Sequence, residues 1–281
     1  GIFRITKSTL FSLSIGILFL VSPVMLNNFD GVMTEPLFIF LSIANLILLN
    51  LYIKENNKWY FWGAVLTACF ATLTRYIGFA SIFSGFLFLI FFSTYPWKKR
   101  ISISLTYAVL ALIPVGIWFV YVGIISNTMA SRTIDLSKSI LEAININRFA
   151  FTEVVAEWLP FRTVWFSSWK SKVITIYSTL LLSGGLVVLT LVLWWKKRVN
   201  SLRSNLALVI CAGIYIVAYF GFLIVSYFST LPPDLNERMF SPLLIFIFIL
   251  IFGSLFNTIS FLKLPKAFAI IPVAFVLILG I

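Results

Sequence analysis

Two carboxylates, Asp30 and Glu35, lie in the segment 30–36, directly before a long apolar stretch. A carboxylate at the boundary of a bilayer is unfavourable unless it is paired, hydrated or bound to a cation, and a well-placed one can accept the proton of an attacking hydroxyl group. A structural role competes with this, because Thr34 can cap the following helix, Glu35 complements its dipole and Pro36 suits its first turn. We take Glu35 and Asp30 as candidate catalytic residues.

Two arginines occupy positions where the charge bias of membrane loops disfavours cations. Arg75 is followed by Tyr76, and Glu237 with Arg238 comes directly before another apolar stretch. Both arginines could have a purely structural role. Arg75 could extend its side chain to the membrane surface, and Arg238 could form a surface ion pair with Glu237 or Asp234. A guanidinium also has the planar, two-pronged geometry that phosphate and carboxylate groups require. Arg75, Tyr76, Arg238 and Glu237 are therefore candidate substrate-binding residues, with Arg75 and Arg238 expected to approach one cavity near Glu35.

The sequence contains no histidine, so the usual neutral-pH base and the commonest metal ligand are absent. Acid and base chemistry must then use Asp, Glu, Lys or Tyr. Cys69 and Cys211 lie inside separate apolar stretches, where thiols usually act as small hydrophobic groups. We expect neither cysteine to be a disulfide partner or a metal ligand, and the cofactor stays open, a divalent cation being one option.

Membrane-spanning helices must position these residues. A chain that is 61% hydrophobic and 11% charged has too little polar surface for a soluble domain. With the Lys/Arg-rich loops placed in the cytoplasm, all of the acidic residues except Glu55 fall on the extracytoplasmic face. The net charge of +12 comes from basic residues beside the spans, which indicates topology and anionic-lipid contact rather than nucleic-acid binding.

The chain is expected to form an all-α polytopic transmembrane bundle of about nine spans. The apolar stretch 59–92 is too long for one crossing, so we expect a hairpin that turns at 74–78 and keeps the basic loops at 54–58 and 98–100 on one side. The other expected spans are 8–26, 35–53, 101–125 with a kink at Pro114, 173–195, 206–228, 239–262 and a last one that starts near 268.

The segment 126–172 should lie outside the membrane as an interfacial helical segment. Its apolar residues recur on one helical face between 151 and 159, and Ser139 with Glu142 has the spacing of a capping box. Such an amphipathic, Trp-rich segment is typical of a helix along the membrane surface. Residues 1–281 read as a single domain, which we expect to be truncated at both ends because it begins at Gly1 and stops inside an apolar run.

Three short motifs carry a family resemblance. Thr34-Glu35-Pro36-Leu37-Phe38 opens a span, Leu73-Thr74-Arg75-Tyr76-Ile77-Gly78 follows, and Glu237-Arg238-Met239-Phe240-Ser241-Pro242 opens a late span. Together they resemble the bacterial membrane glycosyltransferases of the dolichyl-phosphate-mannose protein mannosyltransferase type, which are glycosyltransferase family 39-like and have the C-type glycosyltransferase fold.

The resemblance implies transfer of a sugar, with inversion, from a polyprenyl-phosphate donor to a lipid, glycan or protein acceptor. The site would face outward from a bacterial plasma membrane, with membrane lipids as further partners. Glu35 and Asp30 would lie beside the reacting centre, and Arg75 and Arg238 would bind the donor phosphate. The family's principal catalytic Asp follows a span that would precede Gly1, so we expect this chain to lack it.

Two other functions compete with the enzyme. A solute or lipid transporter, such as a flippase, should show ionisable groups near the midplane, broken helices and paired halves, none of which is evident in the sequence. A noncatalytic membrane assembly factor predicts that the outer charges only solvate their loops.

Overall fold

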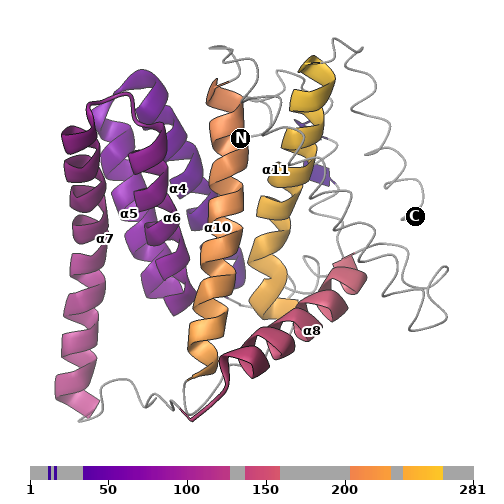
Figure 1. The fold of residues 1–281 in the computed structure, drawn as a ribbon. Coiled ribbons are helices and arrows are strands. Elements are labelled where there is room, and N and C mark those ends of the chain that lie inside the picture. Colours follow the sequence, from indigo (N-terminus) through magenta and orange to yellow (C-terminus); the bar gives the residue numbers. More distant parts are fainter. Residues whose placement is uncertain are drawn as a thin grey trace. The chain divides into compact units, whose positions relative to one another are not determined.

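The computed structural model describes residues 12–13, 16–17, 34–126, 137–158, 203–228 and 237–261, with the side chains of 126, 152–158, 203–206, 237–238 and 257–261 left aside. Every regular element within these residues is helical, which confirms the all-α class there. The elements are α4 (Glu35–Glu55), α5 (Lys58–Thr74), η1 (Tyr76–Gly78), α6 (Phe79–Phe92), α7 (Trp97–Ser126), α8 (Ile140–Trp158), α10 (Arg203–Tyr227) and α11 (Glu237–Phe261), and Figure 1 labels the α-helices.

Four of the described helices are long and apolar enough to cross a membrane. They cover Glu35–Glu55, Trp97–Ile125, Ala207–Tyr227 and Met239–Phe256, and Tyr76–Phe92 forms a shorter apolar helix. The chain is thus an integral membrane protein by the length and composition of its helices. The spans expected at 8–26, at 173–195 and from 268 onward fall outside the part that the structure describes as complete elements.

Helix α4 begins at the residue expected, and the structural role that competed for Thr34, a side-chain cap, is not observed. Pro36 stands at its start and Glu35 in its first turn, whereas the Thr34 side chain makes no capping hydrogen bond. The reason is local geometry: Thr34 has helical dihedral angles (φ −79°, ψ −15°), and a capping side chain needs an extended backbone to reach the free N–H groups. The Thr34 carbonyl instead accepts the bond from the Phe38 N–H at 3.0 Å.

The hairpin turn expected at 74–78 is confirmed. Helix α5 ends at Thr74, Arg75 adopts an extended conformation, and η1 leads directly into α6. A Cβ atom at Gly78 would lie 2.5 Å from the Thr72 amide nitrogen and 2.6 Å from the Ala71 carbonyl oxygen. The absence of a side chain at Gly78 therefore lets the turn pack against the last turn of α5.

The described chain divides into two compact units. Unit 2 contains α4, α5, α6 and α7, which lie side by side (Figure 1), together with the part of α10 that begins at Gly213. Its four helices meet around Tyr107, whose hydroxyl accepts a hydrogen bond from the Asn45 side-chain amide at 2.9 Å; the same amide donates to the Ala64 carbonyl at 2.7 Å. A Cβ at Gly85 would lie 2.5 Å from the Tyr107 hydroxyl, so a residue without a side chain is required there.

Unit 1 contains the start of α10 and all of α11, with the part of α8 from Phe149 onward. The rings of Phe151 and Phe240 are 5.7 Å apart, which joins α8 to α11. A Cβ at Gly253 would lie 2.6 Å from a Val209 methyl group, so α10 and α11 approach closely at that glycine.

The helices of unit 2 alternate in direction. Ser42 of α4 lies beside Ser81 of α6, and the ring of Tyr52, near the other end of α4, contacts that of Phe61 in α5. At this second end, the Tyr95 hydroxyl donates a hydrogen bond to the Asn56 side-chain carbonyl and so connects the α4–α5 and α6–α7 loops. The expectation that the basic residues at 54–58 and 98–100 lie at one end of the bundle is thus met. We call this the basic end, and the opposite end, with Glu35 and Arg75, the ion-pair end.

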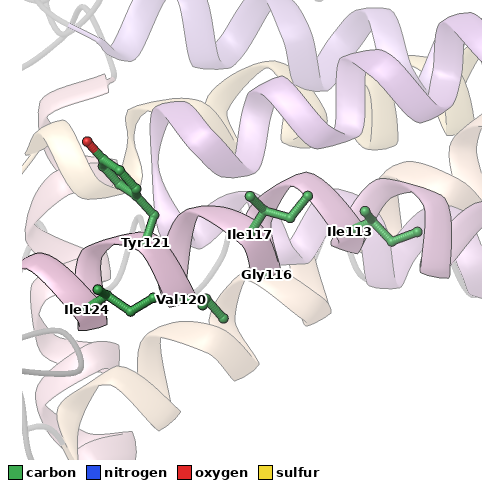
Figure 2. A pocket seen from close by; sticks show the side chains of 6 residues that line it. All are labelled: Ile113, Gly116, Ile117, Val120, Tyr121 and Ile124. Carbon is green, nitrogen blue, oxygen red and sulfur yellow. The ribbon is translucent and has the colours of Figure 1, made fainter.

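Helix α7 carries a shallow apolar hollow of about 500 Å³ (Figure 2). All of its lining comes from this one helix: Ile113, Gly116, Ile117, Val120, Tyr121 and Ile124. The isoleucines and Val120 are at least 49% exposed, as expected for a span whose surface contacts lipid tails. A hollow without convergent polar groups gives no basis for chemistry, so the candidate site must lie elsewhere.

Candidate functional site

The structure brings Glu35 and Arg75 into direct contact. A carboxylate oxygen of Glu35 (Oε1) lies 2.8 Å from a terminal nitrogen of Arg75 (Nη1), and the two side chains are 8% and 17% exposed. Glu35 comes from the first turn of α4, and Arg75 from the link between α5 and η1. Residues that lie far apart in the sequence thus form one mostly buried ion pair.

Backbone hydrogen bonds hold Arg75 in place. Its N–H donates to the Ala71 carbonyl at 3.1 Å, which closes the end of α5, and its carbonyl accepts from the Gly78 N–H at 2.8 Å, which closes η1. The backbone that carries the guanidinium is therefore held by a hydrogen bond on each side of Arg75. Because an isolated buried charge is strongly unfavourable, each member of the pair makes burial of the other tolerable.

Two tyrosines of α10 extend this pair into the bundle. The Tyr219 side chain is fully buried, and its hydroxyl interacts electrostatically with both Arg75 and Glu35. Its ring centroid lies 5.9 Å from that of Tyr215. The Tyr215 hydroxyl donates to the Ser42 hydroxyl at 3.3 Å, and the Ser81 hydroxyl donates to the same oxygen at 3.3 Å. We call Tyr219, Tyr215, Ser42 and Ser81 the tyrosine–serine chain.

The sequence pattern did not predict the tyrosine–serine chain. One signal was available: Tyr215 and Tyr219 are four residues apart and so share a helix face, and a phenol inside a span needs a polar partner. The partner serines gave no such signal, because single hydroxyl groups are common in spans and can bond to their own helix.

Tyr76 lies next to the ion pair along the chain and is 45% exposed. Its ring stacks on that of Phe119 in α7, with centroids 5.3 Å apart and planes 22° from parallel. The stack attaches α7 to the hairpin turn at the ion-pair end. Tyr76 consequently offers a supported aromatic surface beside Arg75.

The remaining predicted site residues are not placed by the structure. Asp30 lies outside the described residues, and Glu237 and Arg238 open α11 by their backbone alone, since nothing is described of their side chains. The expected approach of Arg238 to Glu35 therefore stays a prediction.

The segment before α8 also reaches the ion-pair end. The Lys138 ammonium donates to the Tyr227 carbonyl at 3.0 Å and lies 5.2 Å from the centre of that ring. A cation at the C-terminus of α10 is favoured by the helix dipole. Helix α8 begins directly after Ser139, as the sequence pattern predicted.

The ion-pair end combines a carboxylate, a guanidinium and a supported aromatic ring, which suits proton transfer and the binding of an anion. Among the described residues, no three His, Cys, Asp or Glu side chains gather as a metal site would require, and Cys69 and Cys211 are buried and free. Comparison of the chain with protein families, curated proteins and solved structures finds no significant match.

Proposed function

We propose that the chain is the membrane part of a glycosyltransferase that transfers a sugar from a polyprenyl-phosphate donor to an acceptor hydroxyl at the extracytoplasmic face. The observation that carries the proposal is the buried Glu35–Arg75 pair at the end of the bundle opposite the basic loops. The resemblance of the segments around these two residues to membrane mannosyltransferases supplies the reaction. The fold would comprise about nine spans, with 126–172 along the membrane surface.

In the proposed reaction the acceptor oxygen attacks the anomeric carbon of the donor sugar. The bond from that carbon to the phosphate oxygen breaks, and polyprenyl phosphate leaves with the bonding electrons. The acceptor proton passes to a carboxylate, for which Glu35 is the candidate and Asp30 the second. Attack from the side opposite the leaving group inverts the anomeric centre.

Arg75 supports this chemistry through its number of donors. A guanidinium has five N–H groups, so one edge can hold Glu35 while the partly exposed remainder stabilises the charge that develops on the donor phosphate. Tyr76, beside it, offers its ring to the sugar or to the first isoprene units of the donor. Arg238 and Glu237 are proposed to complete the phosphate site.

The test uses the full-length protein in proteoliposomes with a set of polyprenyl-phosphate hexoses, and measures release of polyprenyl phosphate. Glu35→Gln should reduce release by roughly 10²-fold or more, the range of acid and base catalysis. Arg75→Lys, which keeps the charge but loses the planar fork, should weaken donor use while insertion is unchanged.

Matched controls come from the opposite end of unit 2. Glu55→Gln and Arg100→Lys make the same chemical changes at the basic end and should leave release unaltered. Failure of the wild-type protein to release polyprenyl phosphate from any donor would contradict the proposal. Equal losses in Glu35→Gln and Glu55→Gln would instead remove Glu35 from the mechanism.

A transporter is the second candidate, and the tyrosine–serine chain is the observation that favours it. These hydroxyl groups follow the ion pair into the bundle, and buried polar groups of this kind can line a path for ions or protons. Uptake of a labelled solute by the proteoliposomes, without cleavage of any donor, would support this function.

A further inference from the structure

The two loops at the basic end are built as one surface. Asn56 follows α4 in the left-handed conformation (φ 51°), which Asn tolerates better than most residues, and its N–H donates to the Tyr52 carbonyl at 2.8 Å. This tight turn presents the Asn56 side chain to the Tyr95 hydroxyl of the α6–α7 loop. The loops are thereby fixed relative to each other.

Cations gather around Tyr95. The Lys99 ammonium lies 4.0 Å from the centre of the Tyr95 ring, and the Arg100 Nε–H donates to the Tyr95 carbonyl at 2.5 Å. Four lysines of the two loops are exposed, namely Lys54, Lys58, Lys98 and Lys99, whereas Glu55 is the one acidic residue within 54–58 and 93–100. The surface carries an excess of positive charge in fixed positions.

Exposed indole rings flank these cations. Trp59 is 71% exposed and Trp97 59% exposed, and the Lys58 ammonium lies 6.0 Å from the centre of the Trp59 ring. Trp97 opens α7, and Trp59 lies in the first turn of α5, so both stand where membrane helices enter the headgroup region. A surface of lysines between indole rings at helix ends matches a layer of anionic headgroups above lipid tails.

We propose that the basic end of unit 2 is a binding surface for anionic phospholipid headgroups of the adjacent leaflet, assembled by the Tyr95–Asn56 contact. The lysines supply charge to the phosphates, while Tyr95 sets the spacing of the two loops. This binding does not depend on sugar transfer. The basic end thus has a ligand that differs from the sugar donor proposed for the ion-pair end.

The test titrates the full chain in detergent with phosphatidylglycerol or phosphatidylcholine and counts bound lipids by native mass spectrometry. The wild-type protein should prefer phosphatidylglycerol. Lys98→Gln with Lys99→Gln should reduce the preference at least roughly fivefold, the factor expected from one headgroup cation. Tyr95→Phe, with all charges retained, should lose part of it.

Arg148→Gln is the matched control, since it removes one exposed cation from α8 and should leave the preference intact. Far-UV circular dichroism checks that each variant keeps its helix content. Equal binding of the two lipids, an equal loss in Arg148→Gln, or no loss in Tyr95→Phe would each overturn the proposal. So would saturation of this surface by an RNA oligonucleotide in place of phosphatidylglycerol.

Discussion

The two ends of unit 2 accommodate charge in opposite ways. At the ion-pair end, the Glu35 side chain is 8% exposed and its carboxylate lies 2.8 Å from Arg75. At the basic end, cations such as Lys98 and Lys99 are exposed and far outnumber the acidic groups around them. Buried charges require partners, whereas exposed ones are stabilised by water and screened by salt. The first arrangement favours chemistry on one small group, and the second favours adhesion to an extended charged layer.

The largest loss of stability is expected at the ion-pair end, when the Arg75 cation is removed. Arg75→Met leaves Glu35 buried without its partner and should reduce the free energy of unfolding by about 3–5 kcal/mol, the range for a broken buried pair. Unfolding in mixed detergent and SDS micelles measures this change. The double variant Glu35→Met/Arg75→Met should recover most of the loss. A loss below about 1 kcal/mol would show that the pair behaves like a surface salt bridge and would erase the contrast between the ends.

The position of Arg75 depends on the turn that follows it, so a change at Gly78 sharpens the comparison. Gly78→Ala places a Cβ 2.5–2.6 Å from the backbone of α5 and should cost about 1–3 kcal/mol, because the turn must move. Gly116→Ala is the control: nothing lies within 4 Å of its added Cβ, and alanine favours a helix. The same detergent titration should rank Gly78→Ala well below Gly116→Ala. Equal stabilities would mean that the turn accommodates the added methyl group at no cost in free energy.

The smallest effect is expected at the basic end. Lys99→Met removes an exposed cation and its contact with the Tyr95 ring, and should change the free energy of unfolding by no more than about 0.5–1 kcal/mol. The change should shrink further at high salt. A loss as large as that of Arg75→Met would show that the basic loops hold the bundle together.

Charge parity predicted the position of the hairpin turn correctly. The stretch 59–92 was too long for one span, and the loops on both sides of it were basic, so a turn near Arg75 and Gly78 satisfied both constraints. Loop charge and span length are properties of whole segments, so both can be read directly from the sequence.

The partners inside the bundle were not predictable in the same way. Spans such as α4 and α10 are apolar around most of their circumference, so hydrophobic periodicity does not tell which face meets which neighbour. The absence of a Thr34 side-chain cap has a related reason, since a capping motif does not reveal that the threonine itself adopts helical dihedral angles. The electrostatic interaction of Tyr219 with the ion pair depends on packing between α10 and the hairpin, where the rings of Phe222 and Phe79 stack, and no local pattern encodes this packing.

The place of Arg75 at the tip of a hairpin also bears on how the protein enters the membrane. In the topology expected from the loop charges, with the basic loops in the cytoplasm, insertion of α5 and α6 would carry this cation through the hydrocarbon layer. Helix α4 is synthesised first, so in this topology Glu35 would reach the far side before Arg75. Retreat of the hairpin would then separate the two charges and return Arg75 to the lipid. In that topology the ion pair would favour the inserted hairpin, because the pair can form only after Arg75 has reached the side that holds Glu35.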